Sequence, residues 1–191
     1  MRELSLHIMD IMENSLRAGA GLITLAIEEN RKGNLLRVAV KDDGKGMPEE
    51  MLQEVVNPFY TTRTTRRVGL GLSLFQEAGR RCAGEFNIKS KEGEGTETCA
   101  TFQLDHIDLP PLGDMAGSLI SLIMGNADVD FVYIHKVDDK EFIFDTRRIK
   151  KELDGLPVNH PKVLKYLADV IRDSLADINA GRGGLISRQG K

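Results

Sequence analysis

The spacing of apolar residues predicts one helix and then two strands in the first 42 residues. Over residues 2–18 the apolar positions fall on one arc of a helix and the polar positions on the opposite arc, and Gly19 ends the pattern. In residues 22–29 and 35–42 the apolar positions alternate instead, as they do in strands with one buried face. The expected order is therefore an amphipathic helix followed by a pair of half-buried strands.

The pattern continues with two further helices and a hairpin. Pro48 opens a short helix, since proline is tolerated in a first turn, and a longer helix is expected from about residue 71 to residue 83. Two strands, residues 86–91 and 96–104, flank a glycine-containing turn. This order predicts an α+β fold, a two-layer sandwich in which helices cover one face of a mixed sheet.

Pro110 and Pro111 mark the boundary of a second region. The elements expected after them are a helix, two strands and a final helix, over residues 114–124, 130–137, 141–145 and 161–180. We expect one domain over residues 1–106, a small α/β appendage over residues 112–180 and a flexible tail over residues 181–191.

Composition limits the class of protein. With 41% hydrophobic and 29% charged residues, the chain of 191 residues can bury a proper core. A net charge of -3 provides no general attraction to nucleic acid, so no DNA partner is expected. No apolar run approaches the roughly 20 residues of a membrane span, and the first residues lack a secretory signal pattern. Together with only two cysteines, these features predict a cytoplasmic protein without membrane contact.

Three polar residues of the first predicted helix share one face, because Asp10, Asn14 and Arg17 are spaced by one turn each. This face could simply be the solvated side of the helix. It could also carry chemistry. Asn14 offers a neutral oxygen suited to Mg²⁺, Asp10 a carboxylate that can orient or deprotonate a water or hydroxyl, and Arg17 a cation for phosphate oxygens.

Asp42 ends the second strand in phase with its apolar residues, so its side chain is expected to point into the core. A buried carboxylate is costly unless it has a partner, and a ligand can provide one. Alternatively, the strand has already ended and Asp42 is a turn residue before Gly44 and Gly46.

The segment Gly69-Leu70-Gly71-Leu72 stands where the third predicted helix begins. Glycines at a helix start leave backbone N–H groups open to an anion. Just upstream, residues 57–68 lack apolar periodicity, and residues 61–67 contain four threonines and three arginines. Such a loop suits a lid over a triphosphate, and equally a solvated surface loop.

In this order, and within residues 10–72, these segments resemble the ATP site of the GHKL superfamily, named for gyrase, heat-shock chaperone, histidine kinase and MutL. The resemblance covers residues 4–104 and implies the Bergerat ATP-binding fold with ATP and Mg²⁺ as ligands. It implies that Asn14 holds Mg²⁺, that Asp10 is the catalytic base, and that Asp42 accepts a hydrogen bond from the adenine amino group. The further binding positions that it implies are Arg17, Gly44, Gly46, Phe59, Thr61, Thr62, Arg63, Gly69, Leu70, Gly71, Leu72 and Thr96.

A phosphoacceptor histidine on a dimerising helical hairpin is missing from the sequence. None of the four histidines lies in such a motif, and His7 is expected on the solvated side of the first helix. The chain therefore looks like a histidine kinase-like ATPase domain similar to standalone anti-sigma serine kinases. This resemblance implies that it transfers the γ-phosphate to a separate partner protein. Two alternatives stay open: a non-catalytic ATP-dependent switch that acts on a regulatory partner, and a slow MutL-like ATPase that works as a homodimer.

Overall fold

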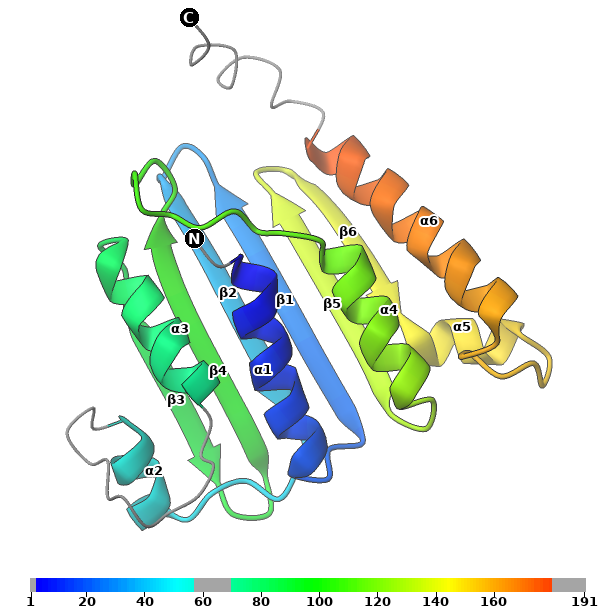
Figure 1. Ribbon diagram of the computed structural model, residues 1–191, viewed down its shortest axis with the longest axis horizontal. Coiled ribbons are helices and arrows are strands. Elements are labelled where there is room, and N and C mark those ends of the chain that lie inside the picture. The colour runs from blue at the N-terminus through cyan, green and yellow to red at the C-terminus, as the bar shows by residue number, and fades with distance from the viewer. Residues whose placement is uncertain (1–2, 57–69, 180–191) are drawn as a thin grey trace, which may run out of the picture.

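The structure is a computed structural model that describes residues 3–56 and 70–179, and its centre is a six-stranded sheet (Figure 1). The strands are β1 (Leu22–Asn30), β2 (Leu35–Asp42), β3 (Phe86–Lys91), β4 (Gly95–Gln103), β5 (Asp130–Val137) and β6 (Lys140–Asp145). Their order across the sheet is β3-β4-β2-β1-β5-β6. Strands β1 and β5 are parallel, and the other neighbours are antiparallel. The predicted mixed sheet of an α+β fold is thereby confirmed.

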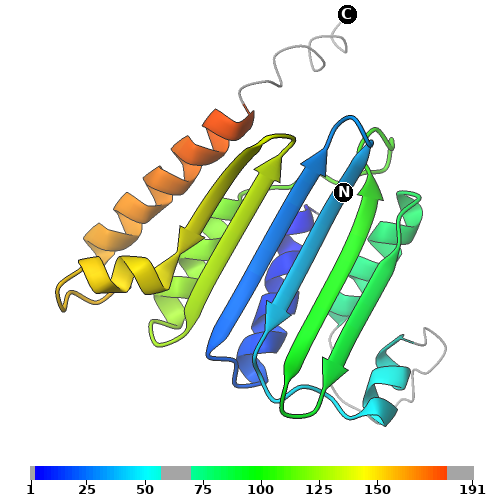
Figure 2. The ribbon, with the colours of Figure 1, turned by 180° about the vertical axis from the view of Figure 1, so that it is seen from behind.

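The described helices are α1 (Leu4–Arg17), α2 (Glu49–Val56), α3 (Leu70–Arg81), α4 (Met115–Gly125), α5 (Thr146–Glu152) and α6 (Pro161–Asn179). Helices α1, α3 and α4 lie side by side over one face of the sheet (Figure 1), and the view from behind shows the strands in front of them (Figure 2). Helix α6 runs along the β6 edge and contacts α4, β5 and β6. None of these helices combines the length and apolar character that crossing a bilayer requires.

The core lies between the sheet and the helices that cover it. The apolar arc of α1 is buried as predicted, with Leu4 and Ile8 fully inaccessible. On β1, Ile23, Leu25 and Ile27 alternate with half-buried residues and face the same core. Burial of each such side chain contributes about 1.5 to 3 kcal/mol relative to exposure. These contacts fix α1 across the middle of the sheet.

The opposite side of α1 differs from the prediction at one residue. His7 is only 7% exposed, and its ring centroid lies 6.5 Å from that of Phe75 on α3. The expectation of a solvated histidine is therefore wrong. The reason is that α3 packs beside α1 and covers part of its polar arc, a contact between distant segments that helical periodicity does not show.

The region after Pro110 and Pro111 extends the same sheet. Strand β5 pairs with β1 over eight residue pairs, from Leu22 opposite Asp130 to Glu29 opposite Val137. The structure shows this region adding the two strands β5 and β6 to the sheet. The division into domains at residues 1–106 and 112–180 stays a prediction.

A buried network of polar side chains links β1 and β5. The Tyr133 hydroxyl lies 2.7 Å from Nδ1 of His135, and Nε2 of His135 lies 3.3 Å from Oε1 of Glu29. All three side chains are buried, and burial raises the pKa of the Tyr133 hydroxyl above its usual value. The two strands are therefore joined by side-chain hydrogen bonds as well as by the backbone ladder.

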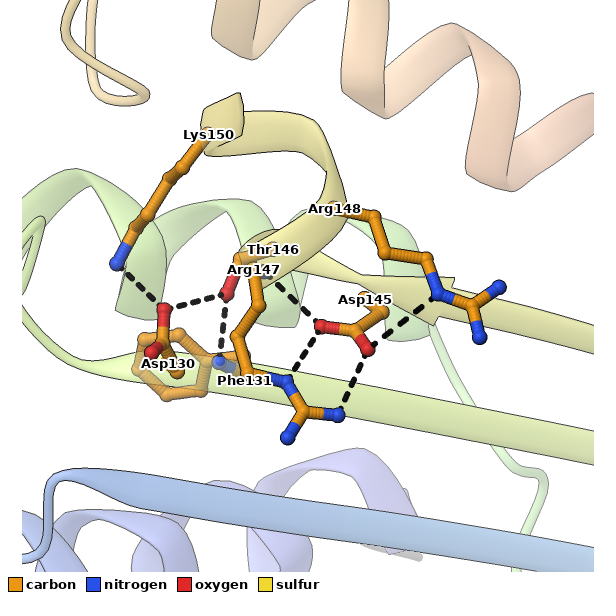
Figure 3. A network of polar contacts seen from close by, with 7 residues as sticks. All are labelled: Asp130, Phe131, Asp145, Thr146, Arg147, Arg148 and Lys150. Atoms are coloured by element: carbon orange, nitrogen blue, oxygen red, sulfur yellow. Dashed lines mark hydrogen bonds and ion pairs between the residues drawn. The ribbon is translucent and has the colours of Figure 1, made fainter. Parts of the chain in front are cut away.

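Helix α5 was not predicted. Residues 146–152 contain Ile149 as their one aliphatic residue, so the segment has no apolar period to recognise. The helix is held instead at its start, where the Asp145 carboxylate accepts from the backbone N–H of Arg147 at 2.9 Å. Figure 3 shows this cap, together with the Lys150 ammonium that pairs with Asp130 on β5 at 2.7 Å.

Candidate functional site

A cavity of about 210 Å³ opens between α1, the loop that follows β2, and the β3–β4 hairpin. Its lining combines apolar side chains with polar groups from α1 and β2, which is the usual make-up of a small-molecule site. The lining residues are Ile11, Asn14, Ser15, Arg17, Ala18, Asp42, Lys45, Gly46, Met47, Met51, Leu72, Ile88, Thr96 and Thr98. Six predicted site residues are thus brought to one cavity: Asn14, Arg17, Asp42, Gly46, Leu72 and Thr96.

The polar face of α1 supplies two of these side chains. Arg17 donates from Nη1 to Oδ1 of Asn14 at 3.2 Å and from Nη2 to Oε2 of Glu13 at 2.9 Å. The Arg17 side chain is 66% exposed, and ion pairs at this spacing on a helix surface contribute only about 0.3 to 0.5 kcal/mol. The guanidinium can therefore turn to a stronger anion, such as a phosphate group, at little cost.

Asp42 is a buried carboxylate at the floor of the cavity. Strand β2 runs to this residue, and its side chain is 7% exposed. The prediction that it points to the core is confirmed, and the alternative of a turn residue beyond the strand is excluded. Oδ1 accepts from the backbone N–H groups of Gly44 at 2.9 Å and Thr96 at 3.3 Å, and Oδ2 accepts from the Ser15 hydroxyl at 2.6 Å. These donors offset the cost of burial.

Of the two glycines after Asp42, Gly46 has no room for a side chain and Gly44 has little. A Cβ at Gly44 would lie 3.0 Å from the Ala18 Cβ, and a Cβ at Gly46 would lie 2.0 Å from the Lys91 carbonyl oxygen. Gly46 also has a φ of 64°, which favours glycine. The close approaches seen here are to α1 and to the β3–β4 hairpin. An approach of these glycines to a base stays a prediction.

Asp10 lies beside the first turn of α3. A Cβ at Gly71 would lie 2.5 Å from the Asp10 Cβ and 3.1 Å from its Oδ2, so the absence of a side chain at Gly71 lets the two helices meet. Leu70 is the first residue of α3, whose N-terminal end carries a partial positive charge that favours a nearby carboxylate. Asp10 therefore lies against the start of α3, and Asn14 follows it by one turn of α1.

Thr96 contributes to the site mainly by supporting its neighbours. Its backbone N–H donates to Asp42, and its hydroxyl lies 2.8 Å from Oγ of Ser90. A direct contact of Thr96 with a base stays a prediction. Five predicted positions lie outside the described residues: Phe59, Thr61, Thr62, Arg63 and Gly69.

Several lining residues were not predicted as site residues. Ser15 is a hydroxyl on the apolar arc of α1, an out-of-place polar group that could have signalled a buried partner. Lys45 stands between two glycines, and its backbone joins α1 to the hairpin, since its N–H donates to Ala18 O at 3.0 Å and its carbonyl accepts from Gly93 N at 2.7 Å. The apolar part of the cavity, including Met47 and Ile88, has no pattern in the sequence that marks it.

The sheet and the cavity together define the class of protein, a GHKL-type ATPase domain. Residues 2–106 match the family model described as histidine kinase-, DNA gyrase B- and HSP90-like ATPase. The chain therefore belongs to this family, which confirms the resemblance inferred from Asn14, Asp42 and the glycine segments.

The curated relatives that the chain resembles include bacterial kinases. It is 30% identical to sporulation kinase C of Bacillus subtilis (strain 168) over 96 residues, which cover 49% of this chain and 22% of the kinase. It is 33% identical to the sensor histidine kinase WalK of the same organism over 94 residues, which cover 46% of this chain and 15% of WalK. The chain thus spans less than a quarter of the length of these relatives.

The fold has a counterpart among solved structures. The N-terminal domain of a DNA repair protein superposes with a TM-score of 0.50 at 13% sequence identity, over 75% of this chain and 52% of that chain. At this identity the similarity supports the fold alone.

Proposed function

We propose that this protein binds ATP with Mg²⁺ and transfers the γ-phosphate to a separate partner protein. One observation carries the proposal: Asn14 and Arg17 of α1 and the buried Asp42 of β2 line the same cavity. The carboxylate at one part of the cavity suits the base of a nucleotide. The cation and the amide oxygen at another part suit its phosphates.

The base end is built from Asp42 and apolar side chains. The Asp42 carboxylate is an acceptor, so it pairs with the amino group of adenine and opposes the carbonyl that guanine has at the same position. Met47 and Ile88 line the cavity nearby and offer an apolar surface for the rings. These residues therefore favour a 6-aminopurine.

The phosphate end is built from α1. Asn14 provides the neutral oxygen that Mg²⁺ accepts as a ligand, and Arg17 provides a charge for phosphate oxygens. Within residues 3–56 and 70–179, no group of three or more His, Cys, Asp or Glu side chains is placed to hold a metal. This fits an ion that takes most of its ligands from the nucleotide, and such an ion would neutralise charge on the transferred phosphoryl group.

Asp10 is the proposed base. It lies on the same helix as Asn14, against the start of α3, where it can take the proton of an acceptor hydroxyl. We propose that the acceptor belongs to another protein.

The test follows the γ-phosphate. The purified protein is incubated with γ-labelled ATP and Mg²⁺, alone and with an extract of its host, and label is counted in protein bands and in free phosphate. Label on a host protein that disappears with Asn14→Ala supports the proposal. Phosphate released without protein labelling would instead indicate an ATPase, and nucleotide binding with neither signal would indicate a switch.

A further inference from the structure

Ser15 carries a buried hydroxyl to which the proposed function assigns no role. It is 3% exposed on the sheet-facing side of α1, one residue after Asn14. Its Oγ lies 2.6 Å from Oδ2 of Asp42 and 3.4 Å from the carbonyl oxygen of Ile11. The contact with the carboxylate is the shorter and charge-assisted one, so the hydroxyl directs its proton at Asp42.

The hydrogen bonds of Asp42 fix how its carboxylate faces the cavity. Oδ1 is held by two backbone N–H groups, those of Gly44 and Thr96, whereas Oδ2 is held by the Ser15 side chain. Donors at both oxygens oppose rotation of the carboxylate about its χ2 axis. Ser15 and Asp42 both line the cavity. A substitution of Ser15 on α1 therefore changes the surroundings of the Asp42 Oδ2 atom.

We infer that Ser15 is a positioning residue, which orients Asp42 to accept from a 6-amino group and thereby sets the preference for adenine over 6-oxopurines. The inference rests on the proposed binding of ATP. With the hydroxyl in place, Oδ2 presents a fixed acceptor to the base. If the hydroxyl is removed, a water molecule can take its position beside Oδ2, and a water can both donate and accept, so it can bridge to a 6-amino or a 6-oxo group alike.

The test compares the binding of ATP and inosine triphosphate, which carries a 6-oxo group, to wild type, Ser15→Ala and Ser15→Thr. For Ser15→Ala we expect the Kd for ATP to rise about tenfold, because binding must then also fix the orientation of the Asp42 carboxylate that Ser15 holds in the free protein. The Kd for inosine triphosphate should change little, so the preference for ATP falls by about the same factor. Ser15→Thr keeps a hydroxyl and should retain most of the preference.

Ser121→Ala is the matched control. Ser121 also lies inside a helix, where its hydroxyl donates to the carbonyl of Gly117 at 2.9 Å, and it does not line the cavity. Its loss should leave both dissociation constants unchanged. Melting temperatures of all variants show how much of any effect is loss of folded protein.

Two results would overturn the inference while ATP binding stands. One is a Ser15→Ala variant whose preference for ATP equals that of wild type. The other is an equal weakening of both nucleotides, which would make Ser15 a structural residue only. Failure of the wild type to bind either nucleotide would overturn the proposed function itself, and the inference with it.

Discussion

The carbonyl oxygen of Lys91 fills the space that a side chain at Gly46 would need. An ideal Cβ at Gly46 would lie 2.0 Å from that oxygen. Close by, the N–H of Gly93 donates to the carbonyl of Lys45 at 2.7 Å. The loop after β2 thus packs closely against the β3–β4 hairpin, and residues of both line the cavity.

Gly46→Ala should therefore be strongly destabilising. The substitution combines a backbone clash with a φ of 64°, and we expect a loss of about 3 kcal/mol or more in the free energy of unfolding. Gly93→Ala is the matched control, since Gly93 has a φ of 78° and open space around its Cβ position, so it should cost only about 1 to 2 kcal/mol. Chemical denaturation measures both. Equal losses would show that the loop can move away from Lys91.

Asp42→Asn should weaken nucleotide binding by about 2 to 5 kcal/mol, because the buried acceptor becomes a group that also donates. Isothermal titration with ATP measures the change. Asp43→Asn serves as the control: Asp43 caps the backbone N–H groups of Gly21 and Leu22 at 2.8 Å and does not line the cavity. It should lower stability and leave affinity alone. An affinity of Asp42→Asn within a few-fold of wild type would contradict the adenine assignment.

Asn14→Ala should chiefly remove the dependence of ATP binding on magnesium. The variant loses the neutral oxygen proposed as the metal ligand and keeps Asp42 for the base. Titrations with ATP in the presence of Mg²⁺ and in the presence of a chelator give the ratio of the two affinities. A ratio equal to that of wild type would show that Asn14 does not hold the metal.

Asp10→Asn should separate binding from chemistry. The amide keeps the size of the side chain against Gly71 but cannot accept a proton, so we expect phosphoryl transfer or hydrolysis to slow about 100-fold or more. The Kd for ATP should change little, because Asp10 does not line the cavity. Label-transfer rates and titrations on the same preparation check both. Unchanged rates would exclude Asp10 as the base.

Asp145→Asn should make stability less dependent on pH in the acid range. Hydrogen bonds from Arg147 hold the pKa of the Asp145 carboxyl below its usual 3.8. A lowered pKa in the folded state stabilises the protein above pH 3.8, and this contribution disappears as the pH falls toward the folded-state pKa.

The asparagine can still cap α5, so the expected loss at neutral pH is about 1 kcal/mol, the value of the partly exposed charge pair. The difference between variant and wild type should shrink below pH 3.8. Denaturant titrations from pH 7 to pH 3 measure it. Asp114→Asn, at the corresponding cap of α4 where the carboxylate accepts from Gly117 N at 2.9 Å, is the control. A difference that is constant with pH would exclude the Arg147 pair as its source.

The sequence predicts those parts of the fold that depend on local pattern. Helix α1 and strands β1 and β2 have a clear apolar period, and the phase of β2 alone places Asp42 in the core. Helix α5 lacks such a period, so the sequence does not predict it. The helix is stabilised instead by the Asp145 cap at its first turn and by the ion pair between Lys150 and a residue of another strand. His7 was placed wrongly for a similar reason: a neighbouring helix decides its burial.

The candidate site also has parts that the sequence predicts and parts that it does not. The resemblance to the GHKL ATP site identifies Asn14 and Asp42 as members of one motif set, and the structure brings both to one cavity. The hydrogen bond between Ser15 and Asp42 joins residues 27 positions apart, and no local pattern reports it. The chemical roles of Asp10 and Asn14 stay predictions, because they depend on a bound nucleotide.

The parallel pairing of β1 with β5 has a consequence for the newly made chain. Leu22 is synthesised long before its partner Asp130, so one edge of β1 has no partner while the intervening residues are added. An unpaired strand edge is a template for pairing with other chains. The same edge would be open in any fragment that ends at residue 106, where the family match ends. In the folded protein, β5 covers this edge of β1, so the edge is closed to pairing with other chains.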